Sequence, residues 1–499
     1  IMIEKFPIEG LKQGDVLITN DPWLCAGHLF DIAIAVPVFR HKKVVSFVGV
    51  VGHVSDIGGT KDSLNAREIY DEGFQIPPMK LFREGVQNDD LFELLGANVR
   101  QPDQVLGDLH ALVSAAMTGA ERIVSFMEEY DMDDLKALAT VVQDRSEKAM
   151  RAAIAAVPDG YYTNTIQGDG LNAALTYPVQ VKVSGDKINV SFDGAPPQLD
   201  LGGSNCTLTY TKAHATYPLK CIFSPDIPGN AGCYRPISID APEGSILNCD
   251  RPASVNIRTR TGWYIGPNIY GALSKAVADR VQAFTGLPSS ALFYGVGQDG
   301  EVYSDHLFQG GGQGGSAHGD GKSALLYPTS AANTSVEMFE ARVPALVLYK
   351  KLIVDSGGAG KHRGGLGQAI AARKLLDDGQ PCQVGIYPNG IHSDVEGLFG
   401  GQPGYSSKGL VHRDEINIVD VGVGRLSSLN TVKDVAELRI AGGSGFGDPL
   451  ERDFRSISND LAQGYISADG AAKDYGCVIR KDGSIDIEAS EKMRASLKA

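Results

Sequence analysis

The sequence of 499 residues has no stretch of 18 or more apolar residues, which excludes a chain built on membrane-spanning helices. Its seven cysteines include no C-x-x-C pair, so a disulfide scaffold or a thiolate zinc site is not indicated. Positive charge is not in excess either, because 46 Lys and Arg stand against 60 Asp and Glu. The net charge of −14 argues against binding to nucleic acid or to an anionic membrane. No secretory signal is recognisable at the start of the chain, so we expect a cytoplasmic protein.

What is present indicates a folded chain of several domains. Hydrophobic residues make up 43% and charged residues 21%, as in ordinary globular proteins, and the length exceeds what one core serves. The 60 glycines are an excess that indicates tight turns and close approaches of backbone segments. We expect a mixed α/β, β-rich multidomain chain. Its predicted parts are a first region over 1–157, a β-rich α+β domain over 158–345, and a β-rich C-terminal region with closing helices over 346–499.

Residues 103–157 carry the strongest helical pattern. Apolar residues recur at spacings of three and four from Leu106 to Met127, as on one face of a helix. A second amphipathic run begins at Asp133 and ends before the turn residues Pro158–Gly160. The pattern predicts a helical hairpin.

Two short apolar runs, residues 32–39 and 44–51, predict an N-terminal β hairpin around the polar residues 40–43. If the turn is centred between Arg40 and His41, residues whose numbers sum to 81 face each other. That register places His28 directly opposite His53.

Asp31 can join these two histidines only if residues 28–31 form a turn ahead of the strand, because its side chain otherwise points away. Two imidazoles and one carboxylate would then form a ligand set for a divalent metal, which suits Mn, Zn or Fe. The alternative is a pair of structural histidines beside strand ends. Both His28–Asp31 and His53–Asp56 have the pattern H-x-x-D, which favours the metal site.

Other polar residues are candidates for supporting roles. Asp56 and Glu72 are the candidate catalytic carboxylates: Glu72 could act as a general base, and Asp56, together with Asp21, could orient the imidazoles. Arg258 and Arg260 could bind an anionic group of a substrate, although a solvated or interface salt-bridged strand is the simpler explanation of this basic run.

Segments spread over nearly the whole chain resemble the hydantoinase B family, also known as N-methylhydantoinase B and as the C-terminal half of ATP-dependent 5-oxoprolinase. Acetone and acetophenone carboxylase subunits are related to this family. The segments that carry the resemblance include 14–22, 27–31, 52–59, 258–262, 355–360 and 445–449.

The resemblance implies one subunit of a two-component enzyme. A hydantoinase A-type partner with an actin-like ATPase fold would bind ATP and phosphorylate the oxygen of a small cyclic amide or imide, and this chain would complete ring opening in a hetero-oligomer. The metal ligands of the acetone-carboxylase relative fall on His28, Asp31 and His53.

These implications lead to the hypothesis of an ATP-coupled cyclic-amide hydrolase subunit. A divalent metal on His28, Asp31 and His53 would lower the pKa of a bound water and direct it at the activated carbon. One alternative is the subunit of an ATP-dependent ketone carboxylase. Another is a catalytically silent scaffold that shapes the active site of the ATPase partner.

Overall fold

A computed structural model of the chain describes residues 2–298, 300–329, 331–392, 395–413 and 416–498. The chain divides into two compact units, one formed by Ile1–Gly160 and Lys182–Gly262, the other by Tyr161–Val181 and Trp263–Ala499. The predicted middle domain, 158–345, is therefore distributed over both units. The mixed, sheet-rich architecture predicted from the sequence is confirmed.

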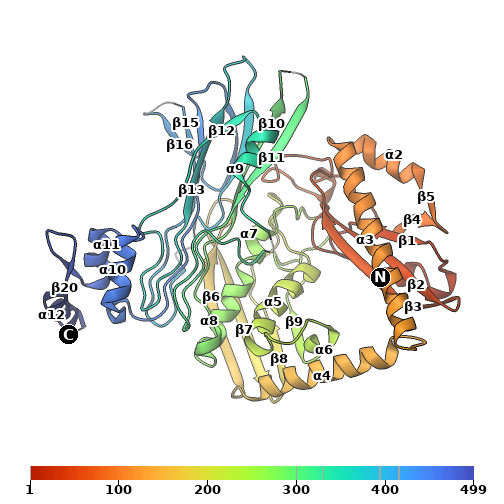
Figure 1. Cartoon of the computed structure of the whole chain (residues 1–499), viewed down its shortest axis with the longest axis horizontal. Coiled ribbons are helices and arrows are strands. Elements are labelled where there is room, and N and C mark those ends of the chain that lie inside the picture. Colours follow the sequence, from red (N-terminus) through yellow and green to blue (C-terminus); the bar gives the residue numbers. More distant parts are fainter. Residues whose placement is uncertain (1, 299, 330, 393–394, 414–415, 499) are drawn as a thin grey trace. The chain divides into compact units, whose positions relative to one another are not determined.

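The first unit is built around an antiparallel five-stranded sheet of order β3-β2-β1-β4-β5 (Figure 1). Its strands are β1 (Val16–Thr19), β2 (Asp31–Arg40), β3 (Lys43–His53), β4 (Met79–Arg83) and β5 (Val86–Gln87), preceded by the short helix α1 (Met2–Lys5). Side chains on β2 alternate between the core and the opposite face, as a half-buried strand requires. Asp31, at the start of β2, lies on the face opposite the buried Ile32 and Ile34.

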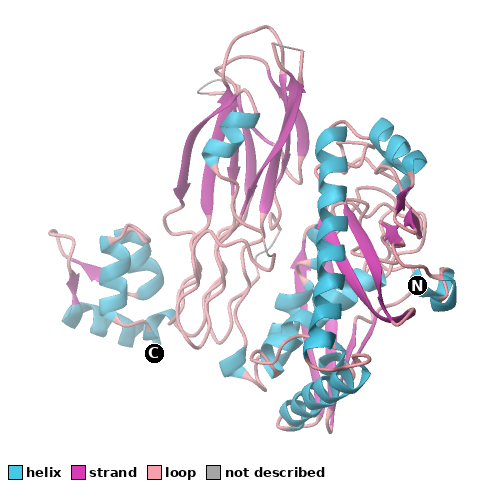
Figure 2. Ribbon diagram, turned by 45° about the vertical axis from the view of Figure 1, so that its right-hand side comes forward, coloured by secondary structure: helices cyan, strands magenta, loops and turns pink. Residues whose placement is uncertain are grey.

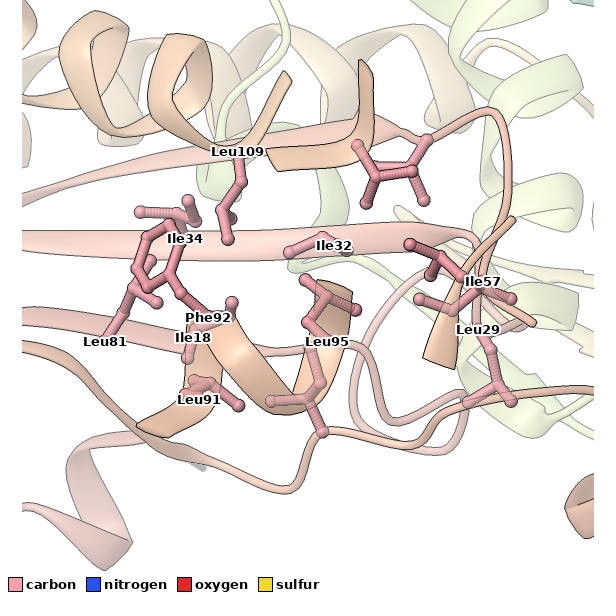
Figure 3. Packing of buried hydrophobic residues seen from close by; sticks show 14 of the residues in the cluster. Ile18, Leu29, Ile32, Ile34, Ile57, Leu81, Leu91, Phe92, Leu95 and Leu109 are labelled. Atoms are coloured by element: carbon pink, nitrogen blue, oxygen red, sulfur yellow. The ribbon is translucent and has the colours of Figure 1, made fainter. Parts of the chain in front are cut away.

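Two helices cover the core face of this sheet. α2 (Asp89–Asn98) and α3 (Pro102–Glu129) pack against each other, and α3 also packs on β2 and β3. Figure 3 shows Leu109 of α3 and Leu95 of α2 meeting Ile32 and Ile34 in one hydrophobic cluster. This cluster fixes β2 and therefore the position of the polar residues at its start.

The two helices predicted over 103–157 exist, but they do not form a hairpin. After α3, the helix α4 (Lys136–Ala155) turns away and packs on α5 (Leu208–Phe223), α6 (Ala231–Tyr234) and β8 (Lys187–Ser191) (Figure 1). On α4, the apolar residues Leu138 and Val142 are 41% and 44% exposed, whereas Met150 and Ile154 are buried. β9 (Ile237–Asp240), which pairs parallel to β8, and α7 (Thr259–Gly262) complete the helices and longer strands of this unit.

The second unit contains two antiparallel sheets, visible at the top of Figure 2. One has the order β11-β10-β14-β17 and the other the order β12-β13-β18-β15-β16. Their inner faces share one hydrophobic core, which includes Phe293 and Val384 from the first sheet and Ile370 and Leu438 from the second. The strands are β10 (Ser289–Val296), β11 (Val302–Gln309), β12 (Ala345–Leu352), β13 (Gln368–Lys374), β14 (Cys382–Tyr387), β15 (Lys408–His412), β16 (Ile418–Asp420), β17 (Arg425–Leu429) and β18 (Val435–Arg439).

The glycine excess has its explanation in extended segments that run side by side below these sheets (Figure 2). They bond to one another through the backbone, for example from Gly365 N to Gln313 O at 2.7 Å and from Gly443 N to Gly365 O at 2.9 Å. A Cβ atom on Gly312 would lie 1.8 Å from the carbonyl oxygen of Gly365, and one on Gly364 would lie 1.9 Å from that of Gly443. Only glycine permits such contact between backbones.

A helical segment closes the second unit, formed by α10 (Phe454–Ala462), α11 (Ala468–Tyr475), β19 (Val478–Ile479), β20 (Ile485–Asp486) and α12 (Ile487–Lys498). Buried ion pairs join it to the glycine-rich segments, because Asp460 accepts from Arg452 at 2.7 Å and from Arg363 at 3.2 Å. The remaining elements include β6 (Gly160–Gly168), β7 (Leu175–Ser184), α8 (Ile265–Leu273) and α9 (Val336–Arg342). None of the helices in the described ranges is both long enough and apolar enough to cross a membrane.

Candidate functional site

The N-terminal hairpin forms, but its register differs from the prediction. His41 and Lys42 make a two-residue turn with φ values of 49° and 63°, the left-handed conformation that matches the twist of a hairpin. A bulge with one extra residue on β3, between Val44 and Ser46, shifts the pairing by one further residue, so that Asp31 rather than His28 lies opposite His53. The predicted pairing of His28 with His53 is therefore wrong, because the turn lies further along the chain and the strand contains a bulge.

The three predicted residues nevertheless come together. His28 lies in a turn that precedes β2, and its Nε2 atom is 2.9 Å from Asp31 Oδ2. The rings of His28 and His53 have their centroids 5.0 Å apart, and Phe30 stacks on His53 at 5.3 Å. The turn that allows Asp31 to lie beside His28 is present. His53 reaches the two residues because it is paired with Asp31 across the strands.

Burial controls the charge state of this cluster. Loss of solvent and the nearby Arg258 charge lower the pKa of His28 to about 4, so the imidazole is neutral at pH 7. Burial opposes ionisation of Asp31, but the His28 and Arg258 side chains lower its pKa below the usual value. The cluster therefore presents a neutral imidazole beside an ionised carboxylate.

The other ring nitrogen of His28, Nδ1, lies next to Asn256, a residue that the sequence did not indicate. Asn256 Oδ1 lies 3.4 Å from His28 Nδ1, and Asn256 Nδ2 donates to Ser63 Oγ at 2.8 Å. Asn256 is 228 residues from His28 in the sequence, and no local motif marks it. Only its nearness to the basic run at Arg258 could have drawn attention to it.

The two arginines predicted to bind an anionic substrate group are both buried in the first unit. Arg258, which is 7% exposed, donates to Asp31 Oδ2 at 3.0 Å and to the carbonyl oxygen of Ala26 at 3.2 Å. Its guanidinium lies over the ring of Tyr210 at 4.7 Å, a cation–π contact. Arg260 is 1% exposed. Arg258 therefore supports Asp31, whereas Arg260 lies in the interior.

The two aspartates predicted to orient the imidazoles bind cationic side chains instead. Asp21 pairs with Arg251. Asp56 accepts from Arg100 Nη1 at 2.8 Å and lies 3.2 Å from Lys61 Nζ. Burial opposes ionisation of Asp56, but the backbone N–H of Arg100 and the Lys61 charge lower its pKa. Both predictions are corrected, because these carboxylates anchor loops through ion pairs and the partner found for an imidazole is Asn256.

Glu72, the second predicted catalytic carboxylate, is not an exposed base. It is 1% exposed, and its Oε1 atom accepts from the backbone N–H groups of Val255 and Asn256, each at 2.8 Å. Burial raises the pKa of Glu72 to about 8, although these two N–H groups oppose the shift. Glu72 therefore fixes the segment that carries Asn256 and Arg258.

Replacing Glu72 by Gln is expected to remove part of the pH dependence of stability. The unfolded Glu ionises near pH 4.5, whereas the folded carboxyl keeps its proton to about pH 8. The unfolded chain thus loses a proton first, and the free energy of unfolding falls as pH rises through this window. The melting temperature of E72Q should rise relative to wild type between pH 5 and pH 8. Glu93→Gln, at an exposed position, is the control, and its melting temperature should not change relative to wild type over this pH range. A difference between E72Q and wild type that stays the same at all pH values would contradict the prediction.

The side chains of the cluster are of the chemical types that bind divalent cations. Two imidazoles and a carboxylate are common ligands of Mn, Zn and Fe, and His28 Nε2 is buried without a hydrogen bond of acceptable geometry. Within the described residues, however, no three His, Cys, Asp or Glu side chains are already arranged around a common point at ligand distances. Asp31 Oδ2 is shared by His28 and Arg258 instead.

The sequence and the sheet-rich fold of this chain both match a known protein family. Residues 1–449 match the family model described as Hydantoinase B/oxoprolinase, and the chain belongs to this family. A relative from Pseudomonas sp. (strain NS671), named as the B-type subunit of a putative D-/L-hydantoinase, is 30% identical over 97% of this chain and 84% of its own length.

Two solved structures share the fold. The ATP-dependent caprolactamase from Pseudomonas jessenii superposes with a TM-score of 0.89 at 28% identity, over 99% of this chain and 87% of that one. Acetone carboxylase superposes with a TM-score of 0.85 over 99% of this chain and 73% of that one. At 19% identity, acetone carboxylase shows the likeness of fold alone.

Proposed function

We propose that this chain is one subunit of an ATP-dependent hydrolase that opens small cyclic amides or imides. Membership of the Hydantoinase B/oxoprolinase family and the likeness to a hydantoinase subunit and to caprolactamase support hydrolysis of this bond type. The partner in the proposal is a hydantoinase A-type subunit with an actin-like ATPase fold, which binds ATP. The word "subunit" in the name of the hydantoinase relative supports such a hetero-oligomer.

The observation that carries the proposal is the contact between His28 and Asp31. Their Nε2 and Oδ2 atoms lie 2.9 Å apart without hydrogen-bond geometry, while Nδ1 faces the acceptor oxygen of Asn256. With the proton on Nδ1, Nε2 carries a lone pair beside the ionised Asp31, and both groups are then available to bind a cation. We assign His28, Asp31 and His53 as the residues that hold a divalent metal.

The reaction proceeds by activation and then hydrolysis. Transfer of the γ-phosphoryl group of ATP to the amide oxygen gives ADP and a phosphorylated imidate. Addition of water to its carbon gives a tetrahedral adduct, from which cleavage of the ring C–N bond releases the amine and leaves an acyl phosphate. A second water converts the acyl phosphate to a carboxylate and inorganic phosphate. A divalent metal held by His28, Asp31 and His53 would supply a nucleophilic water at neutral pH. The residues of this chain hold and orient that site: Arg258 fixes Asp31, and Asn256 fixes His28.

The proposal is tested with the chain co-purified with its ATPase partner. Hydantoin, 5-oxoproline and caprolactam are incubated with ATP, and ring-opened product, ADP and metal content are measured. We expect product from at least one ring, together with a stoichiometric divalent metal. His53→Ala should lose both metal and turnover, whereas a variant with normal metal content and normal turnover would remove the assignment.

Two further measurements distinguish the hydrolase from a carboxylase subunit and from a scaffold. If ATP is consumed only with bicarbonate and a ketone, and the product is carboxylated, the chain is a carboxylase subunit. If the complex turns over without any metal bound to this chain, the chain acts as a scaffold for the ATPase partner. Either result would contradict the hydrolase proposal.

A further inference from the structure

His28 is held by a chain of contacts that none of the sequence patterns indicated. Asn256 receives it on one side, and Ser63 and Glu72 fix Asn256 on the other. All of these residues belong to the first unit. Their arrangement decides which nitrogen of the imidazole carries the proton.

The Asn256 amide has a partner on each of its polar atoms. Its Nδ2 group donates to Ser63 Oγ at 2.8 Å, and its Oδ1 atom faces His28 Nδ1 at 3.4 Å. A carbonyl oxygen can only accept a hydrogen bond, so in this orientation the amide favours the proton on Nδ1. The lone pair of the neutral ring then lies on Nε2, the atom 2.9 Å from Asp31.

The backbone of Asn256 is fixed as firmly as its side chain. The buried Glu72 accepts its N–H at 2.8 Å and that of Val255 at the same distance. Ser63, which completes the contact to the amide, is 6% exposed. Because its backbone N–H and its side chain are both hydrogen-bonded, Asn256 cannot withdraw from His28 without breaking buried hydrogen bonds.

We propose that Asn256 is a positioning residue that selects the Nδ1–H tautomer of His28 and so keeps Nε2 free to bind a metal. Ser63 orients its amide, and Glu72 fixes its backbone. The consequence for metal binding rests on the proposed function, since it assumes that His28 is a ligand. The consequence for the tautomer rests on hydrogen bonding alone and holds in the metal-free chain. Partners of this kind typically change metal affinity by 10–100-fold when they are removed.

Two variants of Asn256 separate positioning from packing. Asn256→Asp keeps an acceptor oxygen opposite Nδ1 at nearly the same volume. Asn256→Leu also has a similar volume but offers no acceptor, so the ring gains by moving its proton to Nε2 and donating to Asp31. Asn98→Leu is the matched control, because Asn98 is exposed and its side chain donates to the carbonyl of Leu94 within the same helix.

The first measurement is the tautomer in the metal-free chain, labelled with ¹⁵N-histidine and assigned by the signal lost in His28→Gln. Wild type, N256D and N98L should show His28 protonated at Nδ1, and N256L should show it protonated at Nε2. A wild-type ring protonated at Nε2, or an unchanged tautomer in N256L, would overturn the proposal.

The second measurement is calorimetric titration of each variant with Mn²⁺. N256L should bind 10–100-fold more weakly than wild type, while N256D and N98L should stay within about threefold. Equal Mn²⁺ affinity of N256L and wild type would overturn the proposal that the Nδ1–H tautomer of His28 favours metal binding. If wild type binds no Mn²⁺, the proposed metal site fails, and the tautomer measurement still decides the role of Asn256.

Discussion

Turnover of the Asp31→Asn variant with the proposed ATPase partner should be lower than that of wild type by roughly a thousandfold. Asparagine keeps the shape of the side chain but removes the charge that faces His28 Nε2 and Arg258 Nη2, at 2.9 and 3.0 Å. Loss of one fixed charged group from a catalytic centre typically has an effect of this size. The variant should also bind less divalent metal, measured by elemental analysis of the purified complex.

The same change should reduce the free energy of unfolding, and this effect must be separated from catalysis. Arg258 is 7% exposed, and a buried cation that loses its carboxylate typically costs about 3 kcal/mol. Asp21→Asn is the matched control, since Asp21 is a carboxylate that also pairs with an arginine. It should lower the melting temperature while turnover stays within about threefold. Equal losses of turnover in D21N and D31N would contradict a special role for Asp31.

The sequence predicted the members of the His–Asp–His cluster more reliably than the geometry that unites them. Asp31 could join His28 only if a turn preceded the strand, and the turn is present. The pairing with His53 was misplaced by three residues, because the position of a polar turn and the presence of a bulge depend on backbone conformation at single residues. A register error of this kind also changes which side chains share a face.

Other parts of the site could not be predicted, because they depend on contacts between distant segments. Asn256 meets His28 across 228 residues, and Glu72 reaches the backbone of Val255 across 183. Glu72 was predicted to be a general base because it lies close in the sequence to His53 and Asp56, whereas the structure buries it and its Oε1 atom accepts two backbone N–H groups. Helical periodicity located α3 and α4, but it could not show that α4 leaves α3 and packs elsewhere.

The glycine excess is the compositional signal with the largest structural consequence, and a single methyl group tests it. Gly312→Ala would place a Cβ atom 1.8 Å from Gly365 O and 2.6 Å from Gly443 N. These two backbones cannot separate freely, because Gly443 N donates to Gly365 O at 2.9 Å. We expect a loss of about 4 kcal/mol or more in the free energy of unfolding, well above the usual cost of a surface change.

Thermal unfolding and limited proteolysis of the second unit measure this loss, and Gly266→Ala supplies the control. Gly266 lies in α8 of the same unit, where a Cβ atom would meet nothing within 4 Å. There the substitution should be neutral or stabilising by up to about 1 kcal/mol, since alanine favours a helix. If both variants unfold like wild type, the glycine-rich segments are not packed backbone to backbone. If only G312A fails, the glycines are required by contact rather than by turn conformation, because Gly312 has no positive φ.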